Sequence, residues 1–240
     1  MVRKKPQAKA KTLLRNDAYD VILMAIIVGD LEPGARVDEK QIMRDFKLGQ
    51  AAVRDALFRL SLEGLVERHA RIGTRIGDLG LRELQDVFEA RILVEGHAAA
   101  LAAHRASADD LAAIRAAYDG YEEVVEARDI RALVTMDRAF HRALAAACKN
   151  SQIERTAIRL YNNAARFWCF GLKRTSVEAN KRQIREHLKV VDAIEKKDFA
   201  EIDRLLRGVL GHFPDSRFLM FDPLRPGERP DVPDVPEAAE

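Results

Sequence analysis

Cysteine is scarce in this chain, and long apolar runs are missing from it. Its two cysteines, Cys148 and Cys169, both fall within apolar helical patterns, so a disulfide framework is not expected and a reducing compartment is. The basic N-terminus lacks the apolar core of a signal peptide. No run of apolar residues approaches membrane-spanning length. These absences predict a soluble, cytoplasmic protein that makes no membrane contact.

Net charge is also small, at +2, but it is unevenly distributed. Residues 1–76 carry 15 lysines and arginines against 10 acidic residues, whereas residues 77–240 carry 25 against 28. A basic N-terminal part suggests a polyanionic partner such as nucleic acid, although a chance imbalance of surface charge would give the same numbers. The 240 residues, 48% of them hydrophobic, suffice for one or two globular domains.

The N-terminal part shows the element order of a winged helix-turn-helix. Residues 1–15 are predicted to be a disordered basic arm, and residues 16–77 a domain that begins with a helix ending before Gly29. The apolar stripe of this helix is Tyr19, Ile22, Leu23, Ile26 and Ile27. Asp38 is expected to cap a second helix, and a third is expected near 50–63. Two alternating segments, 65–68 and 73–76, then predict a small β-hairpin, the wing.

From residue 81 onward the pattern is helical, which predicts an all-α bundle over residues 80–213. Six helices are expected, over 81–104, 109–127, 129–149, 151–171, 176–197 and 199–213. Residues 214–240 hold six of the eight prolines and are predicted to form a disordered acidic tail. The predicted fold class is therefore mainly α, with an N-terminal winged helix-turn-helix followed by a helical bundle.

Four segments together resemble the winged helix-turn-helix of the GntR family of regulators: Leu31–Val37, Ala52–Leu60, Glu63–Arg68 and Gly73–Ile76. The resemblance implies binding to double-stranded operator DNA. A recognition helix enters the major groove by its N-terminal end, while a wing suits the minor groove or the backbone. The expected DNA-binding residues are Lys40, Lys47, Gln50, Ala51, Arg54, His69, Arg71 and Arg75. Taken singly, each of these charges would also fit a solvated helix face.

One departure from the family pattern concerns the start of the recognition helix. Gly49-Gln50 stands where similar members often have Ser or Thr followed by Arg, and Ala51-Ala52 replaces Thr-Pro or Thr-Thr. Arginine there reads guanine, whereas a glutamine amide prefers adenine. The operator sequence is therefore expected to differ from that of relatives that carry the arginine.

The bundle contains a constellation of metal-binding residue types. Asp137 and His141 are four residues apart and share a helix face, and His187 and His212 lie on two other helices among apolar neighbours. Three imidazoles and one carboxylate suit Zn, Ni, Mn or Fe, with zinc expected. The set resembles the FCD sensor domain of FadR-like regulators, and the six-helix count resembles the VanR-type branch. This resemblance implies that Asp137, His141, His187 and His212 are the ligands.

Other polar residues of the bundle have two interpretations. Arg91 matches the family's arginine that meets a ligand carboxylate, but a salt bridge to Glu95 explains it equally well. Arg159, Asn163 and Arg166 follow helical spacing and are candidates to line the same effector cavity, with Tyr161 and Trp168 as its wall. The lone histidines His97 and His104 are interpreted as core residues.

Together these features predict a homodimeric, ligand-responsive transcription regulator, a repressor of a catabolic or transport operon. A small carboxylate effector, bound at the metal, would release it from DNA. Operator symmetry is the reason to expect a homodimer. Two alternatives remain: a regulator for which the metal itself is the signal, and a metal-dependent enzyme, because such a metal site can activate water. The sequence offers no separate general base or nucleophile motif for the enzyme.

Overall fold

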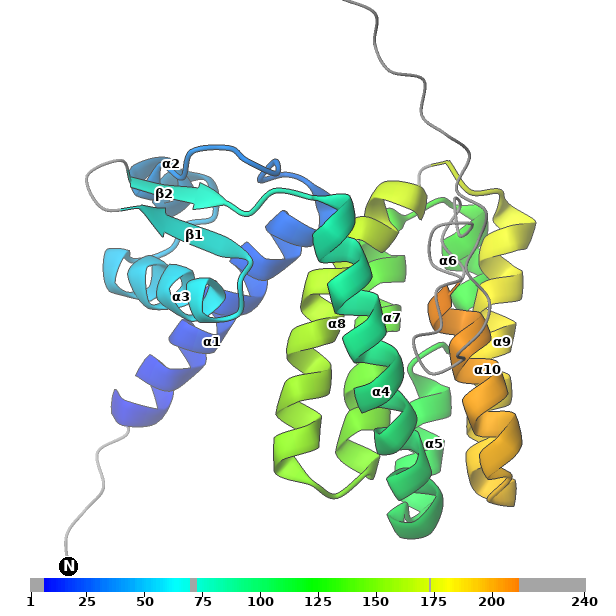
Figure 1. Cartoon of the computed structure of the whole chain (residues 1–240). Coiled ribbons are helices and arrows are strands. Elements are labelled where there is room, and N and C mark those ends of the chain that lie inside the picture. The colour runs from blue at the N-terminus through cyan, green and yellow to red at the C-terminus, as the bar shows by residue number, and fades with distance from the viewer. Residues whose placement is uncertain (1–6, 70–72, 173, 212–240) are drawn as a thin grey trace, which may run out of the picture.

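The computed structural model describes residues 7–69, 73–172 and 174–211. In Figure 1, a small N-terminal domain lies beside a larger bundle of helices. The N-terminal domain consists of α1 (Gln7–Val28), α2 (Glu39–Asp45), α3 (Gln50–Leu62), β1 (Val66–His69) and β2 (Gly73–Ile76). The predicted winged helix-turn-helix is confirmed.

Helix α1 forms the core of this domain by packing against α3. The predicted apolar stripe of α1 is buried, and Gly29 follows it with a φ of +87°, which suits a glycine at a helix end. The helix begins at Gln7 instead of Asn16, so the prediction of a disordered arm is wrong for residues 7–15. The alanines, lysines and leucines of that segment favour helix. Residues 1–6 lie outside the described part of the chain.

Local capping and pairing explain the helix-turn-helix and the wing. As predicted, Asp38 caps α2: its carboxylate accepts hydrogen bonds from the backbone N–H groups of Lys40 and Gln41. Strands β1 and β2 pair antiparallel with Val66 opposite Ile76, and both of these side chains are buried. The other residues of β1 and β2 are exposed or half-buried.

The second domain is a bundle of helices, also as predicted. It contains α4 (Leu81–Arg105), α5 (Ala108–Ala116), α6 (Tyr121–Glu126), α7 (Ile130–Ala147), α8 (Ser151–Leu172), α9 (Val177–Lys196) and α10 (Phe199–Gly211). Helix α4 contacts α7, α8 and α10, while α9 and α10 pack against each other (Figure 1). Apolar residues of these helices share one continuous core with the N-terminal domain. The predicted tail, 214–240, lies outside the described residues.

One predicted helix is wrong in its extent. The segment 109–127 is divided into α5 and α6 by a turn that ends at Gly120, whose φ is +75°. The Asp119-Gly120 pair is a common turn signal that the helical pattern obscured. The described residues between 81 and 211 thus form seven helical segments, α4 to α10. The six-helix count therefore no longer supports assignment to the VanR-type branch.

The prediction that His97 and His104 are core residues is also wrong. Both side chains are exposed on the outer face of α4, and the ring of His104 stacks on Phe199 with 4.9 Å between centroids. The inward face of α4 instead carries buried residues that include Arg91 and Glu95. The two histidines are seven residues apart, so they share one face, and that face is exposed.

Candidate metal centre and DNA-binding face

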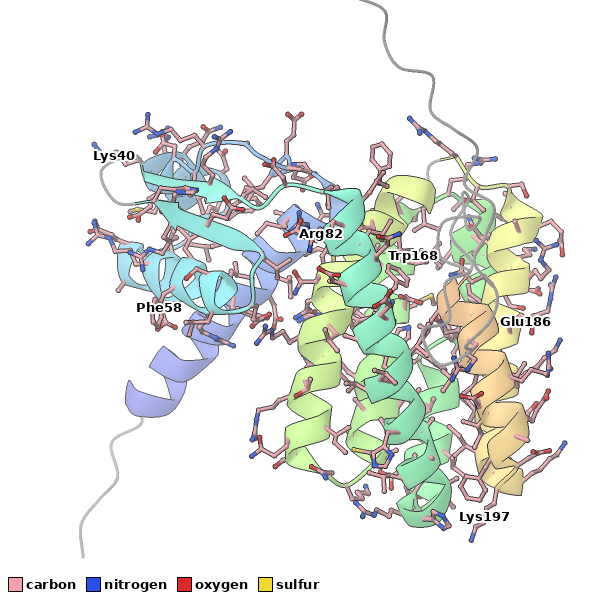
Figure 2. All side chains as sticks on the ribbon, in the orientation of Figure 1. Lys40, Phe58, Arg82, Trp168, Glu186 and Lys197 are labelled. Atoms are coloured by element: carbon pink, nitrogen blue, oxygen red, sulfur yellow. The ribbon has the colours of Figure 1, made fainter. Side chains whose placement is uncertain are left out.

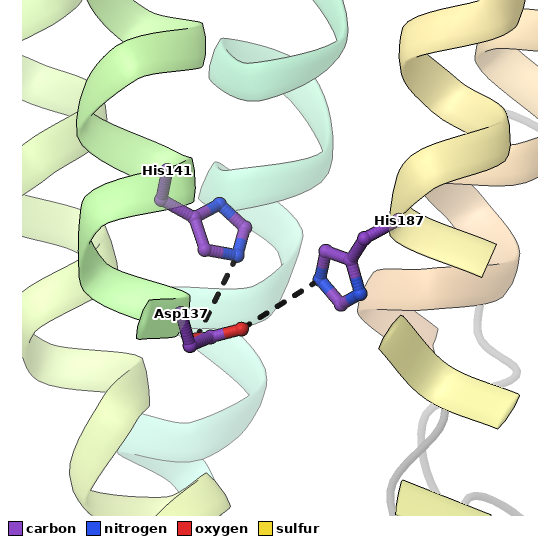
Figure 3. A group of neighbouring side chains, drawn as sticks. All are labelled: Asp137, His141 and His187. Atoms are coloured by element: carbon purple, nitrogen blue, oxygen red, sulfur yellow. Dashed lines mark ion pairs between the residues drawn. The ribbon is translucent and has the colours of Figure 1, made fainter. Parts of the chain in front are cut away.

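Three of the four predicted metal ligands meet inside the bundle. Asp137 and His141 come from α7 and His187 from α9, and all three are buried. The Nε2 atom of His141 lies 3.9 Å from one carboxylate oxygen of Asp137, and Nε2 of His187 lies 4.0 Å from the other (Figure 3). Suitable ligand atoms of the three residues lie within 4.8 Å of one another. The fourth predicted ligand, His212, lies outside the described residues.

The surroundings of the two histidines fit a cation between them. Nδ1 of His187 lies 2.8 Å from the backbone oxygen of Gln183, so Nδ1 carries the proton and the lone pair of Nε2 faces Asp137. Nδ1 of His141 lies 3.0 Å from Oε2 of Glu95, so Nε2 is the ring nitrogen that faces Asp137. Two nitrogen lone pairs and a carboxylate therefore face one another. An ion at about 2.0–2.2 Å from each ligand would satisfy all three.

Protonation states in the cluster also favour ligation. Burial lowers the pKa of His187 to about 4, so its imidazole is neutral, as a ligand must be. The hydroxyls of Tyr118 and Tyr161 donate to the two oxygens of Asp137 at 2.6 and 2.8 Å. Burial raises the pKa of both tyrosines, so they remain protonated donors. The sequence did not point to Tyr118, and it suggested Tyr161 only as a cavity wall.

Arg91 forms the salt bridge that its spacing from Glu95 allowed. Its Nε donates to Oε1 of Glu95 at 2.6 Å, and both side chains are buried on α4. Burial raises the pKa of the Glu95 carboxyl, but Arg91 and then His141 outweigh burial and lower that pKa to about 2. The helical spacing indicated the Arg91–Glu95 pair. It gave no signal that Glu95 also contacts His141, because His141 is on another helix.

The structure corrects the predicted positions of two effector residues on α8. Asn163 donates to the backbone oxygen of Glu63 at 2.9 Å, and Arg166 donates to the backbone oxygens of Gly77 and Asp78 at 2.6 and 2.7 Å. These partners belong to the N-terminal domain and to the segment that joins it to α4. Arg159 is exposed on the same face of α8. Since Tyr161, which reaches the metal cluster, is on the opposite face, none of the three points toward that cluster.

Further polar contacts join the bundle to the N-terminal domain. The side-chain N–H of Asn162 donates to the Tyr19 hydroxyl and to a Glu63 carboxylate oxygen, both at 3.2 Å. Arg138 pairs with Asp20 on α1 at 2.6 Å. Asn162 follows Tyr161 in the sequence, just as Arg138 follows Asp137. Residues next to members of the metal cluster therefore hold the DNA-binding domain.

A groove of about 570 Å³ lies between α8, α9 and α10. Trp168, predicted as a cavity wall, lines this groove and donates from its indole N–H to the side-chain oxygen of Gln183 at 3.2 Å. The backbone oxygen of Gln183 is the partner of His187. The groove therefore reaches to within one helical turn of a metal ligand.

The residues predicted to contact DNA from the helices are exposed. Lys40 lies on α2, whereas Gln50, Ala51 and Arg54 lie in the first turns of α3, and Lys47 lies in the turn between the two helices. Figure 2 shows Lys40 at the outer edge of the N-terminal domain, away from the bundle. Arg54 forms an ion pair with Glu39 at 3.0 Å.

The wing carries the three remaining residues predicted to contact DNA. His69 on β1 and Arg75 on β2 are exposed, while Arg71 lies outside the described residues. Nε of Arg75 donates to the backbone oxygen of Gly34 at 2.9 Å. Arg36, which the sequence analysis did not propose, lines a shallow hollow together with Lys40, Gln50 and Arg54. Its position before α2 gave no helical signal, but a bridge to Arg75 on β2 brings it beside the wing.

Family comparisons agree with this division of the chain. Residues 14–76 match the bacterial regulatory proteins of the gntR family, and residues 86–212 match the FCD domain. Among the residues described, no helix combines the length and apolar character needed to cross a bilayer.

Individual relatives point the same way. A probable D-xylose utilization operon transcriptional repressor of Paenarthrobacter nicotinovorans is 31% identical over 60% of this chain and 64% of its own length. The transcriptional repressor GlaR of Escherichia coli is 29% identical over 82% of this chain and 92% of its own length. The solved structure of E. coli McbR/YncC superposes with a TM-score of 0.72 at 19% identity, over 82% of this chain and 93% of that one. The chain therefore belongs to the GntR family of DNA-binding transcription regulators, in the group that carries an FCD domain.

Proposed function

We propose that this regulator is a homodimeric repressor of a catabolic or transport operon and that a small organic acid releases it from its operator. Two relatives are named as repressors, one of them of a sugar-utilization operon. A single small winged helix reads few base pairs, and a symmetric operator requires two copies. We propose binding, and not catalysis, as the role of the metal cluster, since the relatives are transcription regulators.

The observation that carries this proposal is the short path from the metal cluster to the DNA-binding domain. Tyr161 donates to Asp137, and the adjacent Asn162 bonds to Tyr19 and Glu63. Because Tyr161 and Asn162 are on one turn of α8, a displacement of one moves the other. A ligand that changes how Asp137 is held would therefore move contacts that fix the position of the DNA-binding domain.

Charge in the cluster supports an acid as that ligand. Arg91 and Glu95 neutralise each other, so a divalent ion beside Asp137 leaves a local charge of about +1, which attracts a carboxylate. We propose zinc as the ion and His212 as its fourth protein ligand. Arg91 would contact the acid only by exchanging Glu95 for it. We propose that the remainder of a small acid extends toward the groove beside Trp168, whose lining includes Gln183.

The test begins with an operator selected from random duplex DNA by the full-length protein. Fluorescence anisotropy at fixed salt would then measure operator affinity with a panel of small carboxylic acids, on zinc-loaded and on chelator-treated protein. We expect an acid to weaken the complex only when zinc is present. If zinc alone switches DNA affinity and no acid does, the metal-sensing alternative replaces this proposal. Chemical conversion of an acid by the loaded protein would favour the enzyme.

A further inference from the structure

Glu95 is a second buried carboxylate beside the metal cluster, and neither the family resemblance nor the sequence spacing assigns it to the metal. It lies on α4, where 4% of its surface is exposed. One carboxylate oxygen accepts from Arg91 at 2.6 Å, and the other lies 3.0 Å from Nδ1 of His141. The same carboxylate is therefore shared between a fixed cation and a metal-ligand imidazole.

We infer that Glu95 is a positioning residue for the metal centre: its carboxylate orients His141 so that Nε2 faces the ion, and it strengthens that nitrogen as a donor. A carboxylate behind a ligating histidine fixes the tautomer and raises the basicity of the ring. Arg91 holds Glu95 in place through their 2.6 Å contact. This inference rests on the metal site of the proposed function and adds a residue to it.

The two histidines of the cluster differ in this respect. The group behind His187 is a neutral backbone oxygen, that of Gln183, whereas the group behind His141 is a charged side chain. In this structure the contact between Nδ1 of His141 and Glu95 is short but poorly aligned for a hydrogen bond. Because Nδ1 of His141 lies 3.0 Å from a charged oxygen, we expect loss of that charge to change the orientation of the ring. A probe that reports ligand geometry will detect its loss.

The probe is Co²⁺, added to full-length protein from which metal has been removed. Glu95→Gln keeps the size of the side chain and a neutral acceptor for His141, but it removes the charge. We expect the affinity for Co²⁺, measured by competition with a chelator, to fall about 10- to 100-fold, and the visible ligand-field bands to shift. Glu89→Gln, an exposed position on the same helix, is the matched control and should change neither.

Because Glu95→Gln leaves Arg91 without its partner and could impair folding, Arg91→Met/Glu95→Gln removes both charges together. This double variant should fold and still bind Co²⁺ more weakly, with shifted bands. Wild-type affinity and unchanged bands in a folded double variant would overturn the role of Glu95 and leave the proposed metal site intact. A wild-type protein that binds no Co²⁺ would instead overturn the metal site, and this inference with it.

Discussion

The metal cluster and the DNA-binding face use charged residues in opposite ways. Beside the cluster, Arg91 and Glu95 are 5% and 4% exposed, and they pair with each other across one turn of α4. On the DNA-binding face, the side chain of Arg54 is 62% exposed and pairs with the partly exposed Glu39. Burial makes a charge depend on its partners, whereas an exposed charge costs the fold little and is available to a ligand. Mutations beside the metal cluster should therefore lower the stability of the fold, whereas mutations on the DNA-binding face should lower DNA affinity.

The largest effect on stability is expected from Arg91→Ala. It leaves the Glu95 carboxylate buried without its ion-pair partner, which should lower the free energy of unfolding by about 3–5 kcal/mol. Urea denaturation of the metal-free protein measures this. Arg82→Ala, at an exposed site near the start of the same helix (Figure 2), should stay within about 0.5 kcal/mol of wild type. Equal losses of unfolding free energy in the two variants would show that the buried charge stabilises the fold no more than the exposed one.

Metal removal should have the next largest effect. At a free metal concentration of 100 times its dissociation constant, binding adds about 2.7 kcal/mol to stability. His187→Ala should lose both the metal and this gain, whereas the exposed His97→Ala should keep them. Elemental analysis combined with thermal melts, with and without chelator, distinguishes the two. One tightly bound metal per chain and an unchanged melt in His187→Ala would show that the ligand set is wrong.

Loss of a contact between the two domains should lower the free energy of unfolding by less than loss of Arg91 does. Arg166→Ala removes the donor to the backbone oxygens of Gly77 and Asp78, and it should cost about 1–3 kcal/mol in unfolding free energy. It should also weaken the response of operator binding to the effector. Arg159→Ala, on the same face of α8 but exposed, is the control. If both variants respond to the acid as wild type does, the contacts made by Arg166 do not carry the signal.

A mutation on the DNA-binding face is expected to change operator affinity and not the stability of the fold. Arg54→Ala should weaken operator binding by about 1–3 kcal/mol if Arg54 contacts a base, and it should leave the free energy of unfolding within about 0.5 kcal/mol. Anisotropy titrations and urea denaturation of the same preparation give both numbers. A large loss of stability in this variant would mean that the Arg54–Glu39 pair is structural.

The smallest change in free energy is expected for Gln50, where a substitution should alter base preference at a single operator position. Its amide is suited to adenine, so Gln50→Arg should move the preferred base at one half-site position toward guanine while the melting temperature stays the same. Parallel selections from random DNA with the two proteins measure the preference. Identical selected operators would show that Gln50 reads no base.

Much of the fold followed from local patterns in the sequence. The stripe of α1, the Asp38 cap and the wing are periodic or near-neighbour features, so no knowledge of distant contacts was needed to predict them. The same holds for Asp137 and His141, whose spacing of four places them on one face of α7. The turn at Gly120 was also a local signal, but the helical pattern on either side of it obscured the break.

Only the tertiary structure decided which neighbour each helix face meets. Periodicity grouped Arg159, Asn163 and Arg166 correctly on one face of α8, but that face is turned toward the DNA-binding domain and not toward the metal cluster. The contacts of Glu95 with His141 and of Tyr118 with Asp137 likewise join different elements. Helical spacing determines which residues share a face. The packing of helices that are distant in the chain determines what that face touches, because it depends on the shapes and charges of all the helices together.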